Sequence, residues 1–168
     1  MKSLPVLFAL LVLLPVCHGQ TPYPGSGQDF TLESGINATP TETPSIKLAS
    51  PGDTLVLHYG SPAGTYNFTL PLLIAQIYVT ATPPSATPGL PELHVDPSAL
   101  APWPIIILHN GLATPFPPSL LPPGGLTNAY TVPMMPTGSS IMFQAFSLSP
   151  SPTNPIFTAT DGHEIRMM

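Results

Sequence analysis

Histidine and acidic side chains, the groups best suited to hold a metal or move a proton, come together at two places. His94 and Asp96 would share one face of a strand, and Asp161, His163 and Glu164 follow one another around a glycine. Zinc and other transition metals need three or four such ligands converging, usually at more regular spacing. Asp-Gly is equally typical of a hairpin turn. We therefore expect no metal and no cofactor, and a metal-dependent enzyme using Asp96 or Asp161 is the least favoured hypothesis.

A serine nucleophile is the second chemistry to consider. Ser61 lies between Gly60 and Gly64, but it is one position too early for a G-x-S-x-G turn and a proline follows it. That turn also leads from a strand into a helix, and the sequence indicates no helix after it. The acids are dispersed, with no carboxylate pair suited to glycoside hydrolysis. We expect no catalytic residues and no enzymatic activity.

Aromatic side chains in loops suggest ligand binding. Trp103 stands between two prolines, and Tyr23 and Phe116 lie in other predicted loops. Flat rings of this kind can stack on sugars, because one face is apolar and the edge is polar. This predicts a carbohydrate-binding module as an alternative function. The simpler interpretation is that Trp103 fills the end of the core.

Two N-x-[ST] sequons, at Asn37 and Asn67, are candidate N-glycosylation sites if the source organism glycosylates. Asn67 falls on the predicted solvent face of a strand.

The first 19 residues have the layout of a secretory signal peptide. Lys2 precedes an apolar run, and Cys17 and Gly19 provide the small-residue exit, with cleavage expected before Gln20. The apolar run is too short to span a bilayer comfortably. We expect a helical leader, no membrane span after cleavage, and a protein that is secreted, periplasmic or at the cell surface.

Charge is scarce throughout the chain. It has three Lys and Arg against eight Asp and Glu, a net charge of −5, and only 7% charged residues. Such a chain cannot neutralise a run of phosphates, so nucleic acid is excluded as a partner. The single cysteine lies in the leader, so core packing alone must hold the mature fold. The specific partner is unknown, and the candidates are a second copy, an extracellular polysaccharide or another surface protein.

Alternating apolar and polar residues between prolines and glycines predict an all-β fold. The chain has 26 prolines and 13 glycines, which helix interiors do not tolerate. The clearest predicted strands are 52–59, 65–70, 72–80 and 139–148. Shorter strands are expected at 30–33, 45–49, 93–95, 156–160 and 163–167. Segment 105–108 is apolar on both faces, so we expect it to lie centrally in a sheet.

These strands predict an antiparallel β-sandwich of the jelly-roll or immunoglobulin-like kind, with proline-rich loops. The domain organisation expected is a signal peptide at 1–19, a Pro/Thr/Gly-rich segment with one possible strand at 20–44, and the sandwich at 45–168.

A family resemblance rests on several short motifs. They are the segment HVDPSAL at 94–100, the Gly111-Leu112 turn, the Val132-Pro133 pair and the segment MFQAFSLSP at 142–150. Their order along this chain is also their order in the family that the chain resembles. Over roughly residues 49–168 the chain resembles an uncharacterised secreted β-rich domain found in exported proteins of planctomycetes and related environmental bacteria. The resemblance implies an extracellular β-rich domain without an established activity, and it assigns no functional residues.

The function expected from the sequence is therefore non-enzymatic. The leader, the low charge and the proline punctuation predict an exported protein with a structural or adhesive role in the cell envelope or extracellular matrix.

Overall fold

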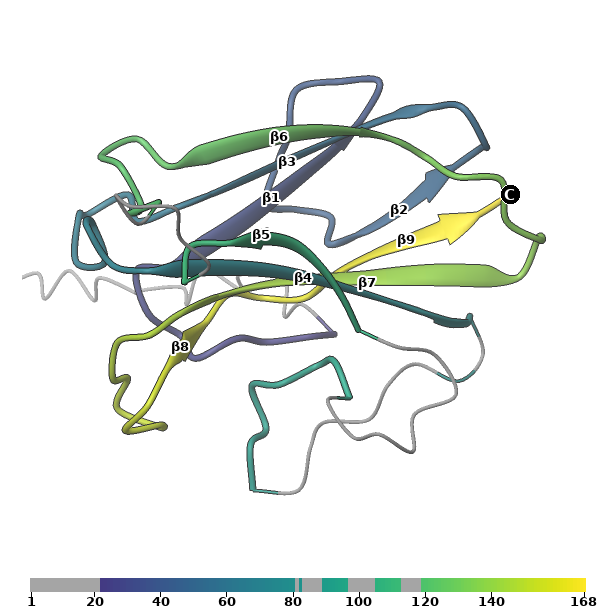
Figure 1. Cartoon of the computed structure of the whole chain (residues 1–168). Helices are drawn as coiled ribbons and strands as arrows, with labels where there is room; N and C mark the ends of the chain where they lie inside the picture. Colours follow the sequence, from purple (N-terminus) through teal and green to yellow (C-terminus); the bar gives the residue numbers. More distant parts are fainter. Residues whose placement is uncertain (1–21, 81, 83–88, 97–104, 113–118) are drawn as a thin grey trace, which may run out of the picture.

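The described part of the chain consists of strands, turns and loops, and it contains no helix (Figure 1). The computed structural model describes residues 22–80, 82, 89–96, 105–112 and 119–168. The expected leader helix at 1–19 lies outside these residues. Within them, no helix is long and apolar enough to cross a membrane.

The strands form two sheets. The smaller sheet has the order β1-β3-β6 and is antiparallel, with strands β1 (Thr31–Ile36), β3 (Thr54–Gly60) and β6 (Leu126–Thr131). The larger sheet has the order β2-β9-β7-β4-β5, with strands β2 (Ile46–Ala49), β9 (His163–Met167), β7 (Ser139–Ser147), β4 (Pro71–Val79) and β5 (Ile105–Asn110). The short strand β8 (Thr158–Ala159) also pairs with β7. Within the larger sheet β2 and β9 are parallel, and the other pairs are antiparallel.

One apolar core joins the two sheets. Period-two alternation turns Leu55, Leu57 and Tyr59 of β3 to the same side, and all three are buried. They belong to one cluster with residues of the larger sheet, including Leu73, Ala75, Phe143, Ala145 and Ile165. Full burial of a leucine side chain stabilises a fold by about 1.5–3 kcal/mol. The described residues contain no cysteine, so this shared core joins the two sheets without a disulfide.

The larger sheet is covered on its other face as well. Tyr78 of β4 and Met142 and Phe146 of β7 point away from the smaller sheet, and they form a second buried cluster with Tyr23 and Val95. The covering residues come from outside the strands. Burial on both faces explains why β4 and β7 are apolar almost without interruption.

Several predicted strands are confirmed. The structure places β3, β4, β7, β9 and β2 where the alternation predicts strands. The predicted strand at 30–33 is longer and becomes β1, and the one at 156–160 is reduced to the two residues of β8. The segment 20–44 thus contributes β1 to one edge of the smaller sheet.

Two predicted strands are wrong. Residues 65–70 form turns instead, and Phe68, expected inside, is 66% exposed with φ of 62°. Asp29 imposes this loop, since its carboxylate accepts hydrogen bonds from the backbone amides of Ala63 and Thr65. Residues 93–95 are also not a strand. There the His94 amide donates to the Gln144 side chain instead of to a neighbouring strand.

The expected central position of 105–108 is also wrong. This segment belongs to β5, which among the described residues pairs with β4 alone and lies at the edge of the larger sheet. Ile106 and Ile107 are 41% and 55% exposed. Side chains of this edge strand, Ile106 and Leu108, form one wall of the candidate site described below.

Candidate functional site

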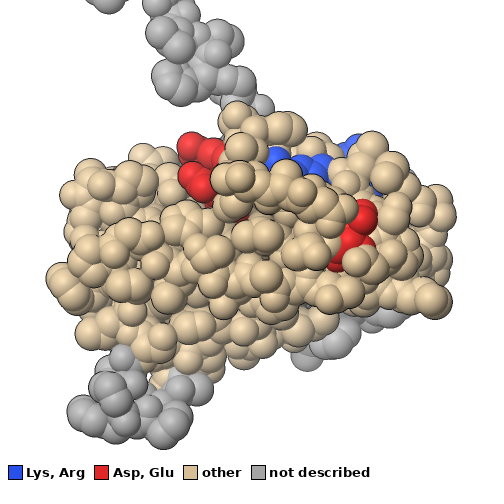
Figure 2. All heavy atoms as spheres, turned by 90° about the horizontal axis from the view of Figure 1, so that it is seen from above, with Lys and Arg blue, Asp and Glu red and all other residues tan. Residues whose placement is uncertain are grey.

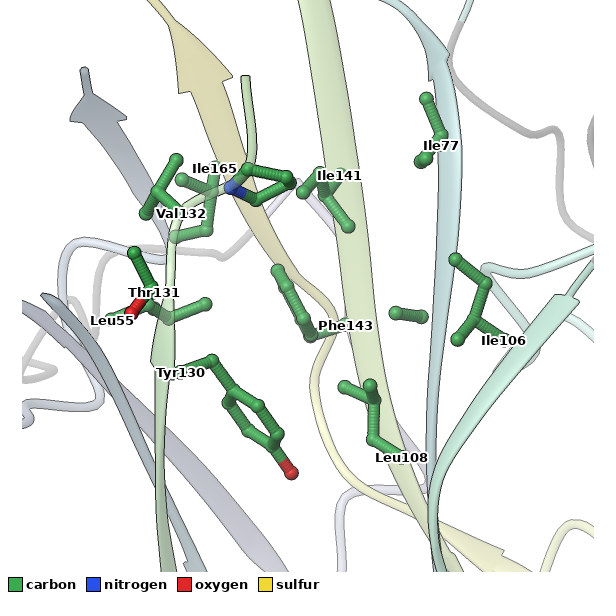
Figure 3. A pocket seen from close by; sticks show the side chains of 12 residues that line it. Leu55, Ile77, Ile106, Leu108, Tyr130, Thr131, Val132, Ile141, Phe143 and Ile165 are labelled. Carbon is green, nitrogen blue, oxygen red and sulfur yellow. The ribbon is translucent and has the colours of Figure 1, made fainter. Parts of the chain in front are cut away.

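An apolar pocket of about 190 Å³ lies between the two sheets (Figure 3). Its wall is almost wholly hydrocarbon and comes from both sheets. The smaller sheet contributes side chains of β3 and β6, and the larger sheet those of β4, β5, β7 and β9. The main lining side chains are Leu55, Ile77, Ile106, Leu108, Ile141 and Phe143.

A β-bulge in β5 shapes one wall of this pocket. Leu73 of β4 pairs with His109, and the next residue, Ile74, pairs with Ile107, so Leu108 has no partner in the ladder. A bulge lets two consecutive residues turn to the same side of a sheet. Leu108 consequently lines the pocket, while the His109 ring lies 6.1 Å, centroid to centroid, from the ring of Tyr59 in the opposite sheet.

Three buried polar atoms without hydrogen-bond partners belong to residues of the inter-sheet space that do not line the pocket. They are the hydroxyl of Tyr59, the side-chain nitrogen Nδ2 of Asn128 and the ring nitrogen Nε2 of His109. Tyr59 is completely buried. A buried polar group that lacks a partner costs about 1–3 kcal/mol, so such groups are rare in a core without a reason.

The electrostatics of Tyr59 show which groups are near it. Burial raises the pKa of Tyr59 to about 12. A polar interaction with the Asn128 side chain lowers this pKa, and the charge of Tyr130 raises it. Asn128 is therefore close to the Tyr59 hydroxyl although the two lack hydrogen-bond geometry. Burial lowers the pKa of His109, so its imidazole is neutral at pH 7 and can donate or accept one hydrogen bond.

A second polar cluster lies on the far face of the larger sheet and is closed. The Glu164 carboxylate is fully buried and accepts hydrogen bonds from Tyr23 at 2.7 Å, Ser140 at 2.9 Å and Arg166 at 2.9 and 3.0 Å. Burial alone would raise the pKa of Glu164, but the hydrogen bonds, that of Arg166 first, outweigh it and lower the pKa. Both carboxylate oxygens of Glu164 are hydrogen-bonded. Through Tyr23 they hold the N-terminal segment against this face of the larger sheet.

This cluster decides the position of Tyr23. The sequence places it in a loop as a possible sugar platform, but the structure leaves only 9% of it exposed, with its hydroxyl bound to Glu164. Its ring also meets the His94 ring edge-on at 5.6 Å. The other two aromatic candidates, Trp103 and Phe116, lie outside the described residues.

A buried serine–histidine pair lies on the inner side of β9. Ser34 Oγ is 2.7 Å from His163 Nδ1, and both residues are fully buried. Burial, helped by the nearby charge of Lys47, lowers the pKa of His163 to about 4. Such a pair has the composition of a nucleophile and its base, but neither side chain has exposed surface.

The predicted acid–histidine clusters do not converge. His163 and Glu164 are consecutive in β9 and so point to opposite faces of the larger sheet. His94 Nε2 bonds to the Pro24 carbonyl oxygen at 2.6 Å. Across the described ranges, no three His, Cys, Asp or Glu side chains are grouped so that they could hold a metal ion.

The two sequon asparagines lie in turns. Asn37 is exposed, and its side chain bonds to Asp53 Oδ1 at 2.8 Å and to the Thr54 amide at 2.9 Å. Asn67, expected on a strand, is half-buried in the loop that Asp29 organises. The side chain of Asn37 is therefore the more accessible of the two.

The outer face of the smaller sheet holds a more polar hollow of about 240 Å³. Glu33 and His58 are directly opposite each other on β1 and β3, and Thr127 follows on β6. His58 Nδ1 is 2.8 Å from Thr127 Oγ1. Gly125, with φ of +77°, lets the chain pass within van der Waals contact of the His58 ring, because a Cβ there would lie 2.8 Å from it.

Sequence reasoning missed β6 and with it the pocket. The segment LTNAYT carries four polar or small residues and shows no apolar stripe, although Leu126, Asn128 and Tyr130 alternate correctly. The one signal in this segment is the spacing of Leu126, Asn128 and Tyr130, of which Tyr130 lines the pocket. Comparison of the chain with family models, curated proteins and solved structures found no significant match.

Proposed function

We propose that this protein is an exported, non-enzymatic β-sandwich that binds small apolar molecules between its sheets. The observation that carries the proposal is the hydrocarbon-lined pocket at the β5–β6 side of the core. Apolar concave sites with a few polar groups are the usual form of a small-molecule site. The two sheets that share one core support a sandwich of the jelly-roll or immunoglobulin-like kind.

The size of the pocket limits the ligand. An apolar cavity of about 150 Å³ holds a benzene molecule. The pocket here, at about 190 Å³, fits one ring with a short substituent or a short aliphatic chain. Ligands with so few atoms bind with micromolar to millimolar dissociation constants, on the order of −4 to −8 kcal/mol.

Two further observations support a binding role without chemistry. The side chains of Ser34 and His163 have no exposed surface, and the Glu164 oxygens are already bonded. Export is proposed from the first 19 residues, and the resemblance over residues 49–168 to secreted bacterial domains agrees with it.

A titration of the protein with ethylbenzene, followed by nuclear magnetic resonance, tests the binding role. We expect saturable shifts of pocket signals, and we expect them to disappear in Ile106→Trp. Ile106 lines the pocket and is 41% exposed at its mouth, so a larger side chain can block the opening without entering the core. Non-saturable shifts spread over the surface would refute the proposal.

A structural or adhesive role is the second candidate, favoured by the surface. Charged side chains occupy only a few places on the face shown in Figure 2. Large apolar side chains are exposed, among them Met134 at 92%, Ile156 at 67% and Leu48 at 58%. Such a surface does little to prevent self-association. Sedimentation over a range of concentrations tests this role, and a strict monomer at high concentration would argue against self-adhesion.

Because Tyr23 is buried, the hypothesis of carbohydrate binding depends on the other two aromatic residues, Trp103 and Phe116. If glycan titration leaves the fluorescence of Trp103, the single tryptophan, unchanged, this function loses its support.

A further inference from the structure

We infer that one end of the two-sheet fold docks on a neutral phospholipid surface, with the side chains of Phe68, Leu120 and Leu148 entering the lipid. These three residues are called the apolar end. Their side chains are 66%, 40% and 52% exposed. The apolar end is a different part of the molecule from the pocket, so this inference is independent of ligand binding between the sheets.

The three residues belong to loops at the same end of the two sheets. Phe68 lies between β3 and β4, Leu120 precedes β6, and Leu148 follows β7. The antiparallel pairing of β3 with β6, and of β4 with β7, places the strand ends next to these loops side by side. Figure 1 shows all four strand ends at the left of the molecule.

Backbone hydrogen bonds join these loops to one another. The Phe68 amide donates to the Leu121 carbonyl oxygen at 2.8 Å, and the Leu121 amide donates to that of Thr69 at 2.9 Å. The Leu148 amide donates to the Leu70 carbonyl oxygen at 3.4 Å. Leu121 is completely buried in the core that the two sheets share. The apolar end therefore has a fixed base on the core.

Phe68 has a backbone conformation that is unfavourable for its residue type. Its φ is 62°, in the left-handed region that bulky side chains rarely adopt. The ring gains no compensating burial in the core, because most of it is exposed. Backbone strain of this kind is concentrated at functional sites, where the surrounding structure maintains it. The fold thus holds a large aromatic ring in solvent, and burial of the ring in lipid would offset the strain.

The apolar end carries almost no charge. Residues 54–91 and 97–160, which include all three loops, contain no Lys, Arg, Asp or Glu. In Figure 2 the visible charged side chains lie away from the left end of the molecule. Asp29 is bonded to the loop that leads to Phe68, and its carboxylate accepts hydrogen bonds from Ser61, Ala63 and Thr65. The three loops themselves bring no charged side chain to the lipid.

The small size of this surface favours a lipid bilayer over a protein partner. Three partly exposed side chains offer roughly 200–300 Å² of apolar area, judged from the area that one aromatic side chain buries. A stable protein interface buries about 1,200–2,000 Å² in total. Phe and Leu side chains that enter the boundary between headgroups and acyl chains need no complementary protein surface. The net charge of −5 disfavours anionic lipids, so phosphatidylcholine is the expected surface.

Co-sedimentation of the protein with phosphatidylcholine vesicles measures the partition coefficient. The leader is removed first, because its apolar run would itself bind lipid. The residues of the two buried clusters lie between Tyr23 and Met167, so the processed chain keeps them all. Wild type should bind, and it should bind more weakly when phosphatidylserine is mixed into the vesicles. Phe68→Asn should lower the partition coefficient about tenfold, since it removes the largest apolar side chain of this surface.

The same variant separates lipid binding from folding. Asn adopts the left-handed region more readily than Phe, so Phe68→Asn should leave the stability against urea unchanged or higher. The matched control is Met134→Ser, in the loop between β6 and β7 at the opposite end of these strands. Met134 is almost fully exposed, and its replacement should leave the partition coefficient unchanged.

The wild-type protein gives a second readout that needs no variant. Spin-labelled phosphatidylcholine in the vesicles should broaden the methyl signals of Leu120 and Leu148. The methyl signals of Val79, which is exposed at the far end of β4, should stay sharp.

Each outcome supports or overturns the inference. It is overturned if wild type does not partition onto phosphatidylcholine vesicles, if Phe68→Asn binds them as wild type does, or if Met134→Ser lowers binding equally. If Phe68→Asn reduces self-association without lipid but leaves vesicle binding intact, this surface is a contact between copies and the lipid inference is also overturned. None of these results affects the proposed ligand binding in the pocket, which the ethylbenzene titration tests separately.

Discussion

Acidification should destabilise this protein well above the pH at which carboxylates titrate, and His163 is the cause. Its side chain is fully buried between the sheets with Nδ1 2.7 Å from Ser34 Oγ. Burial, with a contribution from Lys47, lowers the pKa of His163 from 6.5 to about 4. The neutral imidazole fits the core, and its protonated form does not.

The sign and size follow from proton linkage. Between about pH 6.5 and 4 the unfolded chain binds a proton at His163 that the folded protein does not, so folding stability falls as pH falls. The full effect is roughly 3 kcal/mol, and about 2 kcal/mol of it is lost between pH 7 and pH 5. The contribution is fully present above pH 6.5. For a domain with about 5–15 kcal/mol of stability this is a large change.

Urea unfolding at pH 7 and pH 5, for wild type and His163→Gln, measures the effect. The variant will be less stable at pH 7, but its stability should change by less than half as much between the two pH values. His109→Gln is the comparison variant. Burial lowers the pKa of His109 as well, so this histidine also makes folding stability fall as the pH falls. Equal pH dependence in wild type and His163→Gln would refute the reasoning.

Three further substitutions test other contacts by urea unfolding. Glu164→Gln should cost about 1–2 kcal/mol, because the buried carboxylate loses its charge-assisted hydrogen bonds while Arg166, whose side chain is 38% exposed, stays solvated; a loss below about 0.5 kcal/mol would contradict the network's role. Asp29→Ala should cost about 1–2 kcal/mol and make the loop at 61–65 susceptible to proteolysis, because three hydrogen bonds from that loop are lost; a loop as resistant as in wild type would count against it. Gly125→Ala should cost at least about 2 kcal/mol, since the new Cβ would lie 2.5 Å from the Tyr59 carbonyl oxygen at a φ of +77°; Gly124→Ala, where the same φ region meets open space, should cost less.

Alternation predicted the strands that have one face in the core. In β3 the residues Leu55, Leu57 and Tyr59 face the larger sheet, and the pattern in the sequence is the pattern of burial. The same holds for β4 and β7, whose apolar runs follow from burial on both faces. For these elements the local pattern and the tertiary contacts agree.

The wrong predictions for residues 65–70 and 105–108 have a common physical reason. Groups distant in the sequence determine the local structure there. Residues 65–70 alternate as a strand should, but the Asp29 carboxylate binds the preceding loop. The apolar run of β5 has the composition of a central strand, yet no strand pairs with its outer edge among the described residues. Hydropathy alone cannot separate the edge of a cleft from the centre of a sheet.

The candidate site could be predicted only in part. The alternation of β3 and β4 indicated the inward side chains Leu55 and Ile77, but the pocket also needs β5 and β6 opposite each other in different sheets. Nothing in either segment fixes that arrangement. The unpartnered atoms of Tyr59 and Asn128 become visible only once the sheets are placed together.

The most direct test of ligand binding between the sheets is a set of nuclear Overhauser contacts between ethylbenzene and isoleucine methyl groups. Contacts are expected from the ring to Ile106 and Ile141, which line the pocket, and none to Ile156, which is 67% exposed outside it. Contacts to Ile156 of equal strength, or none to Ile141, would contradict a ligand site in the core.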